Sequence, residues 1–149
     1  MSPFWLRKLI NFYPPILAAG IRVTKITNDF RRTEVKMVLR FYNRNAVGTQ
    51  FGGSLYAMTD PFYMLMLMQI LGRDFMVWDK AAAIDFVAPG TGCVYASFDI
   101  DDVVLAEIRE KTADGAPHFP QFQINVVDAD GKIIARVHKT LYVRKKKPK

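Results

Sequence analysis

Residues 45–71 read NAVGTQFGGSLYAMTDPFYMLMLMQIL, and this stretch decides the fold. Its second half, from Leu55 to Leu71, is apolar on nearly every side and carries one charge, at Asp60. A helix without a polar face must be covered by other elements. Because 17 residues that contain Asp60 and Pro61 make a poor transmembrane span, we predict a buried helix and no stable membrane insertion.

The segments before this helix predict one helix and two strands. Ser2 and Pro3 are typical of a helix start, and Pro14-Pro15 ends that helix. A first strand is expected near residues 21–27. Residues 33–41 alternate cleanly and predict a half-buried strand. Its apolar face would hold Val35, Met37, Leu39 and Phe41.

The segments after the apolar helix predict four further strands. Asp101 or Asp102 can cap a short helix over residues 103–112, and Asp130-Gly131 is typical of a hairpin turn. Because these strands have short connections, the sheet should be largely antiparallel. We therefore predict an α+β fold with a curved antiparallel sheet wrapped around the central apolar helix. The four strands are expected at residues 75–88, 93–100, 119–127 and 132–143.

The charge is concentrated at the C-terminus. The chain of 149 residues has 21 basic and 14 acidic residues, and five of the basic residues lie in the last six positions. Residues 1–143 therefore carry a net charge of only +2, whereas a folded nucleic-acid binder should carry its charge on a face of the fold. We predict one domain over 1–143 and a solvated basic tail, 144–149, that does not continue the last strand. A loose contact of the tail with phosphate or an anionic surface is the alternative.

Cysteine and histidine are too few for several kinds of site. Cys93 is the only cysteine, and His118 and His138 are the only histidines. A disulfide scaffold is excluded and a zinc site is not expected. The sequence predicts neither a metal nor a cofactor. With no secretory signal visible, we expect a cytoplasmic protein.

The candidate chemistry lies in residues 45–60. Gly52 and Gly53 stand before a helix, where free N–H groups and close backbone approach favour binding of an oxyanion. Asp60 follows two helical turns later among apolar residues, a placement typical of functional carboxylates. The structural alternative is that Asp60-Pro61 caps a helix and that the two glycines form a turn.

The spacing Asn-x-x-Gly-x-x-x-Gly-Gly-x-x-x-x-x-x-Asp before an apolar helix resembles a known family. It is similar to the hotdog-fold acyl-CoA thioesterases of the phenylacetyl-CoA thioesterase type, and most similar to a branch without an established function. The order of elements resembles that family over residues 15–143. The resemblance implies that Asp60 is the general base or nucleophile, that the Gly52 amide polarises the thioester carbonyl, and that Asn45 helps to hold water or the carbonyl.

Three residues depart from the family pattern. Phe51 replaces the histidine that often precedes the two glycines, and Pro61 follows the acid where family helices continue. Asp79 is the nearest equivalent of a helper Ser or Thr on the next strand. Pro61 removes a hydrogen bond to the Ala57 carbonyl and should kink the helix.

The implied function is hydrolysis of an acyl-CoA thioester by a homodimer or a dimer of dimers, with Asp60 of one subunit opposite the glycine amides of the other. Gly53, Phe51, Met58 and Met64 are the candidate substrate-binding residues; the methionines could instead belong to the core. A non-catalytic acyl-CoA or fatty-acyl binding protein is the main alternative. An acyl-thioester dehydratase or hydratase is less favoured because no histidine lies in the segment.

Overall fold

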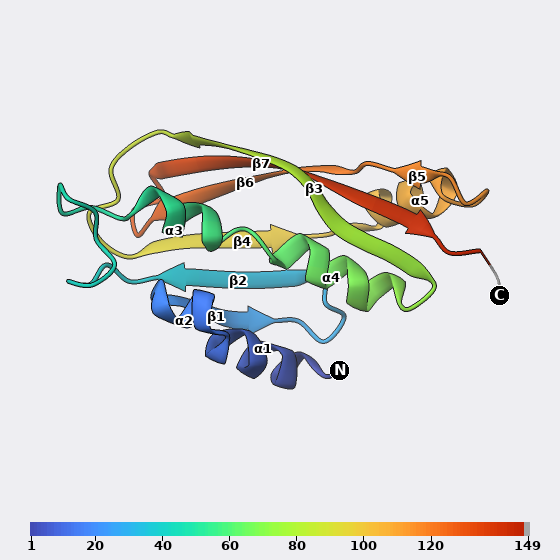
Figure 1. The fold of residues 1–149 in the computed structure, drawn as a ribbon, viewed down its shortest axis with the longest axis horizontal. Helices are drawn as coiled ribbons and strands as arrows, with labels where there is room; N and C mark the ends of the chain where they lie inside the picture. Colours follow the sequence, from blue (N-terminus) through green and yellow to red (C-terminus); the bar gives the residue numbers. More distant parts are fainter. Residues whose placement is uncertain (148–149) are drawn as a thin grey trace.

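The computed structural model describes residues 1–147, and Figure 1 shows a long curved sheet with helices on one side and at its ends. The elements, in chain order, are α1 (Pro3–Phe12), α2 (Pro14–Ala18), β1 (Ile21–Ile26), β2 (Arg32–Met37), α3 (Gly52–Ala57), α4 (Phe62–Leu71), β3 (Phe75–Phe86), β4 (Val94–Asp99), α5 (Asp102–Lys111), β5 (Pro117–His118), β6 (Gln121–Asp128) and β7 (Ile133–Lys145).

The strands form a single antiparallel sheet in the order β1-β2-β4-β6-β7-β3, with the short β5 paired to β7. The longest pairing joins β3 to β7, from Phe75 opposite Lys145 to Phe86 opposite Ala135. Within residues 1–147, β1 and β3 are therefore the two edge strands of this main path. The α+β class and the curved antiparallel sheet predicted from the sequence are confirmed.

The core lies between α4 and the concave face of the sheet. Phe62 and Leu67 of α4 are buried, and the Phe62 ring packs on Phe98 of β4 with centroids 4.9 Å apart. Tyr63 stacks on Phe122 of β6 at 3.9 Å. The apolar helix is covered by the sheet because it has no polar face to offer to water. No helix within residues 1–147 is long and apolar enough to cross a membrane.

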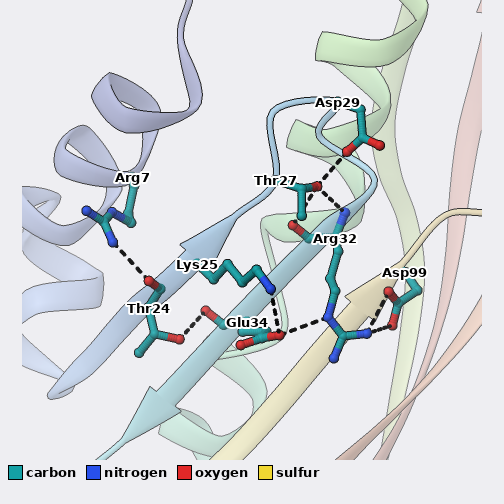
Figure 2. A network of polar contacts seen from close by, with 8 residues as sticks. All are labelled: Arg7, Thr24, Lys25, Thr27, Asp29, Arg32, Glu34 and Asp99. Atoms are coloured by element: carbon teal, nitrogen blue, oxygen red, sulfur yellow. Dashed lines mark hydrogen bonds and ion pairs between the residues drawn. The ribbon is translucent and has the colours of Figure 1, made fainter.

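Polar contacts fix α1 and the first strands in place (Figure 2). Arg7 of α1 donates to the Thr24 carbonyl, and Arg32 of β2 contacts both Glu34 and Asp99. Asn11 makes two more bonds to β1: its amide donates to the Val23 carbonyl and its carbonyl accepts from the Val23 N–H. These bonds dock α1 on the β1 edge, where it forms one wall of the pocket described below.

The strand expected at residues 33–41 is shorter than predicted. β2 ends at Met37, which pairs with Ile21 on one side and Val94 on the other, and neither partner strand extends beyond that point. The Asn43 side chain then accepts from the Arg40 N–H and donates to the Ala19 and Val38 carbonyls. Phe41, predicted on the buried face, is instead 83% exposed.

The central helix is divided rather than kinked. α3 ends at Ala57, a turn follows, and α4 begins at Phe62. Pro61 lacks an N–H and cannot continue the hydrogen-bond ladder, so the Asp60 N–H bonds the Ala57 carbonyl at 3.3 Å and the chain turns. Asp60 therefore lies between two helices. It does not cap α4, since the N-cap of α4 is Pro61 and has no side-chain bond.

Both ends of the chain also depart from expectation. Pro14-Pro15 ends α1 as predicted but also begins α2, because proline fits the first helical position. β7 runs through Lys145, so the first two residues of the expected basic tail continue the strand. Arg144 donates to the Gly115 carbonyl, and the Lys146 N–H donates to the Asp74 carbonyl. The prediction that the tail does not continue the last strand is therefore wrong for Arg144 and Lys145, which find partners in neighbouring segments. Residues 148–149 lie outside the described part.

Candidate functional site

Asp60 is held by donors from two other elements. Its Oδ1 accepts from the Tyr56 hydroxyl at 2.8 Å and from Lys139 Nζ at 3.0 Å. Lys139 also donates to the Asp60 backbone carbonyl at 2.6 Å. Oδ2 has no donor among residues 1–147, and 46% of the side chain is exposed. One carboxylate oxygen is thus fixed, and the other is free to meet a ligand or water.

Lys139 links two carboxylates beneath the site. Its side chain is completely buried on β7, and Nζ also lies 2.9 Å from Asp79 Oδ1 on β3. That contact is an ion pair without hydrogen-bond geometry, so Asp79 Oδ1 has no hydrogen-bond donor within residues 1–147. A buried ammonium is stabilised only when charges and acceptors surround it. Asp60 and Asp79 supply both.

Burial affects the two remaining groups of this cluster. Burial raises the pKa of Tyr56, and its bond to Asp60 raises the pKa further, so the hydroxyl stays a neutral donor. Burial also raises the pKa of Asp79, while Lys139 acts to lower it and the charge of Asp60 to raise it. We refer to Tyr56, Asp60, Asp79 and Lys139 as the carboxylate cluster.

Asp60 lies at an apolar pocket of about 620 Å³ between α1 and α4, called here the α1–α4 pocket. Leu6, Leu9 and Ile10 of α1 form one side, and Met64 and Leu65 of α4 form the other. Among the described residues, 1–147, Asp60 is the only charged one in the lining. A mostly apolar cavity of this size with one placed polar group is typical of a small-molecule site.

A second pocket of about 360 Å³, the glycine-loop pocket, is lined by Asn45, Gly52 and Phe86 among others. The N–H groups of Gly52 and Gly53 begin α3 and have no acceptor within residues 1–147. A side chain on Gly52 would meet the exposed Phe86 ring at 3.0 Å, so the ring would have to shift to admit it. Asn45 and Gly52 are therefore brought together, whereas Asp60 lines the other pocket.

The Asn45 side chain closes its own loop. Its amide donates to Thr49 Oγ1 at 2.9 Å, and its carbonyl oxygen accepts from the N–H groups of Val47 and Thr49. The neighbouring Gln50 is buried and donates to the Met37 and Gly92 carbonyls, but its Oε1 has no donor among residues 1–147. In this chain Gln50, rather than Asn45, offers an unused polar atom beside the glycine-loop pocket.

The four predicted substrate-binding residues lie in three different places. Met64 lines the α1–α4 pocket. Met58 is completely buried in the core and lines neither pocket. For Met58 the structure agrees with the alternative that the methionines belong to the core. Phe51 is half exposed at the start of α3, and a side chain on Gly53 would meet its ring at 2.5 Å.

Sequence reasoning missed Tyr56 and Lys139. For Lys139 a signal was present: Val137, Lys139 and Leu141 share one face of a strand, so a charge falls at an inward position. A lysine on a buried face requires a partner of opposite charge. Asp60, a carboxylate in an apolar segment, was a candidate for that partner. No group of acidic, His or Cys side chains within residues 1–147 is arranged to hold a metal ion.

Solved structures confirm the class of fold. A Pseudomonas aeruginosa protein of unknown function, named a probable thioesterase, is 14% identical, covers 97% of both chains and has a TM-score of 0.85. A thioesterase from Haemophilus influenzae is 15% identical with a TM-score of 0.71, covering 97% of this chain and 92% of its own. A Chlorobaculum tepidum protein of unknown function is 15% identical, covers 98% of both chains and has a TM-score of 0.75. The chain therefore has the hotdog fold found in thioesterases.

The particular family follows from the sequence. Residues 5–143 match the model of the domain of unknown function DUF4442, and the chain belongs to that family. No curated protein matches the sequence significantly. The match spans both pockets and the whole carboxylate cluster.

Proposed function

We propose that the protein hydrolyses an acyl-CoA thioester to a free acid and CoA. Asp60 Oδ2 takes a proton from water, and the oxygen of that water adds to the thioester carbonyl carbon. The tetrahedral intermediate then breaks its carbon–sulfur bond, and the CoA thiolate leaves and takes up a proton. In the nucleophilic variant Oδ2 attacks the carbonyl carbon directly and the carbon–sulfur bond breaks, so that CoA leaves as a thiolate and takes a proton from water. A further water molecule then hydrolyses the resulting anhydride to the free acid and the Asp60 carboxylate.

The observation that carries this proposal is the asymmetry of the Asp60 carboxylate. Oδ1 is fixed by Tyr56 and Lys139, while Oδ2 is free beside an apolar pocket. A general base needs a defined orientation and an unused lone pair. Both are present at one edge of a cavity that suits the acyl part of a substrate.

Two separate pockets support a homodimer. Asp60 lines the α1–α4 pocket and Gly52 the glycine-loop pocket, so one subunit does not bring acid and amides to the same cavity. β3 is an edge strand of 12 residues whose open side can pair with a second copy. We therefore assign the oxyanion-binding amides of Gly52 and Gly53 to the partner subunit's copy of the loop.

The first test is thiol release from a series of acyl-CoA substrates. Asp60→Asn should lower kcat by about 10² or more, since positioned general bases contribute about 10²–10⁴ in rate. Asp130→Asn, in the exposed turn before Ile133, is the matched control and should keep the parent kcat. Full activity of a folded Asp60→Asn variant would leave Asp60 with a structural role only.

Subunit mixing tests the shared site. Gly52→Val should block close approach of the thioester to the glycine amides, which in a dimer serve the Asp60 of the other subunit. The expected loss is about 10²–10³ in kcat. If Asp60→Asn and Gly52→Val subunits exchange, the mixed dimer regains one intact site and up to about half of the activity. A monomeric mass by light scattering, or no recovery after demonstrated exchange, would contradict the shared site.

A non-catalytic acyl-binding protein is the second candidate, and two contacts favour it. The Asn45 side chain is used to close its loop, and Asp60 is already paired with Lys139. In that case Asp60 would serve to tie β7 to the turn before α4. Absence of thiol release with every acyl-CoA, together with calorimetric binding of the same molecules, would select this candidate.

A further inference from the structure

The α1–α4 pocket has features that restrict its ligand further than the proposed function does. Within residues 1–147 its lining is aliphatic and aromatic apart from Asp60, and no cationic side chain contributes to it. Among the lining residues within residues 1–147, the Tyr13 hydroxyl is the one neutral polar side-chain group, so the pocket offers no ion-pair partner to a second carboxylate and few donors to a polar chain. An anionic group inside would lie beside the Asp60 carboxylate with no cation in the lining to compensate the repulsion.

We propose that this pocket binds the uncharged hydrocarbon part of an acyl group, with the thioester at Asp60 and the chain running between α1 and α4. This inference rests on the proposed function for the thioester but not for the hydrocarbon part. The volume of about 620 Å³ lies within the range typical of small-molecule pockets.

The position of Asp60 at this pocket also separates substrate from product. A thioester is neutral at its carbonyl and can approach the carboxylate, whereas the free acid product is an anion. Like charges in a partly desolvated site repel, so the product should bind more weakly than the thioester. Dicarboxylic acyl groups such as succinyl should be rejected for the same reason.

The α1 side of the pocket is held to the sheet by hydrogen bonds. Arg7 and Asn11 bond α1 to the Thr24 and Val23 backbones of β1. Leu9 faces the pocket from α1 and remains 60% exposed, so the pocket has an apolar surface that is open to water. Covering such surface with hydrocarbon is favourable in proportion to its area.

The experiment compares kcat/KM across matched acyl-CoA substrates. Each buried CH₂ contributes about 0.8 kcal/mol, or roughly fourfold, so octanoyl-CoA should exceed butyryl-CoA by on the order of 10². Succinyl-CoA has the same chain length as butyryl-CoA with a terminal carboxylate, and should fall at least about tenfold below it. A flat chain-length profile, or succinyl-CoA equal to butyryl-CoA, would overturn the proposal.

Two variants place the effect in this pocket. Leu9→Trp should narrow the pocket and reduce kcat/KM for octanoyl-CoA at least about tenfold more than for butyryl-CoA. Leu17→Trp is the control, because Leu17 lies on α2, is also exposed and does not line the pocket, so the parent profile should persist. Equal losses with both substrates in Leu9→Trp would contradict the assignment.

Calorimetric binding separates failure of this inference from failure of the proposed function. Octanoyl-CoA should bind Asp60→Asn protein at least about tenfold more tightly than CoA, and Leu9→Trp should remove that difference even if no thiol is released. If CoA and octanoyl-CoA bind equally while hydrolysis proceeds, the chain lies elsewhere. If Leu9→Trp instead converts a dimer to monomers by light scattering, the pocket is a contact between two copies and the proposal is wrong.

Discussion

Replacing Lys139 with methionine tests the cluster on which the candidate site depends. Methionine keeps most of the unbranched stem but removes the ammonium group. The change deletes two donated bonds to Asp60 and the ion pair with Asp79. It leaves two carboxylates facing an apolar side chain on β7.

The expected cost follows from burial. Removing one partner of a buried ion pair destabilises by about 3–5 kcal/mol because the remaining charge is left without compensation. Asp60 is nearly half exposed and can regain water, whereas Asp79 is only 24% exposed. We therefore expect the lower end, about 3 kcal/mol at pH 7. For a domain near 150 residues, this corresponds to a Tm lower by about 6–12 °C.

The pH dependence gives the decisive signature. Burial already raises the pKa of Asp79, and losing Lys139 raises it further. A carboxyl whose folded pKa lies above its unfolded pKa stabilises the fold at low pH, and this contribution is lost as pH rises through the folded pKa. The difference in free energy of unfolding between parent and Lys139→Met should therefore be smaller near pH 4 than at pH 7, measured by urea unfolding.

Two variants control the interpretation. Lys36→Met, on β2 with no ion pair within residues 1–147, should change stability by less than about 0.5 kcal/mol. Asp79→Asn combined with Lys139→Met should recover part of the loss, since Asp79→Asn removes the carboxylate that Lys139→Met leaves uncompensated. A loss below about 1 kcal/mol, or one that is equal at pH 4 and pH 7, would refute the reasoning.

Three further outcomes can be measured by thermal unfolding. Asp101→Ala should lower Tm by about 2–4 °C, since the Asp101 side chain caps α5 through the Val104 N–H and such caps contribute about 1 kcal/mol; no change would remove the cap from the account. Asn43→Ala should cost about 1–2 kcal/mol because three partly buried backbone groups lose their partner, and a neutral effect would mean that water replaces the Asn43 side chain. Truncation after Val143 should lower Tm by several degrees because the bonds of Arg144 and Lys146 are lost, whereas an unchanged Tm would restore the view of a dispensable tail.

Part of the molecule could be predicted because its signals are local. An apolar helix without a polar face requires a cover, and strands of alternating residues with short connections supply an antiparallel sheet. The α5 cap at Asp101 and the interruption at Pro61 also follow from neighbouring residues alone.

Other features depended on partners that are far away along the chain. The strand pattern continues to Phe41, yet β2 ends at Met37 because no neighbouring strand extends further to accept its hydrogen bonds. The charge of Arg144 and Lys145 predicts a free tail, but β3 lies alongside and pairs with them. The alternation of residues predicts which face of a strand each side chain prefers, but it does not predict where the neighbouring strand ends.

The sequence by itself determined that a lone acid, Asp60, stands between a glycine pair and a buried helix. The tertiary structure decided what surrounds that acid. Lys139 reaches it across 79 positions of sequence, and Asp79 joins the pair from a third element. It also placed Asp60 and Gly52 in different pockets of one chain. Spacing along a chain fixes local geometry. Which charges pair is decided only when packing removes them from water, because each charge then has only the other as a partner.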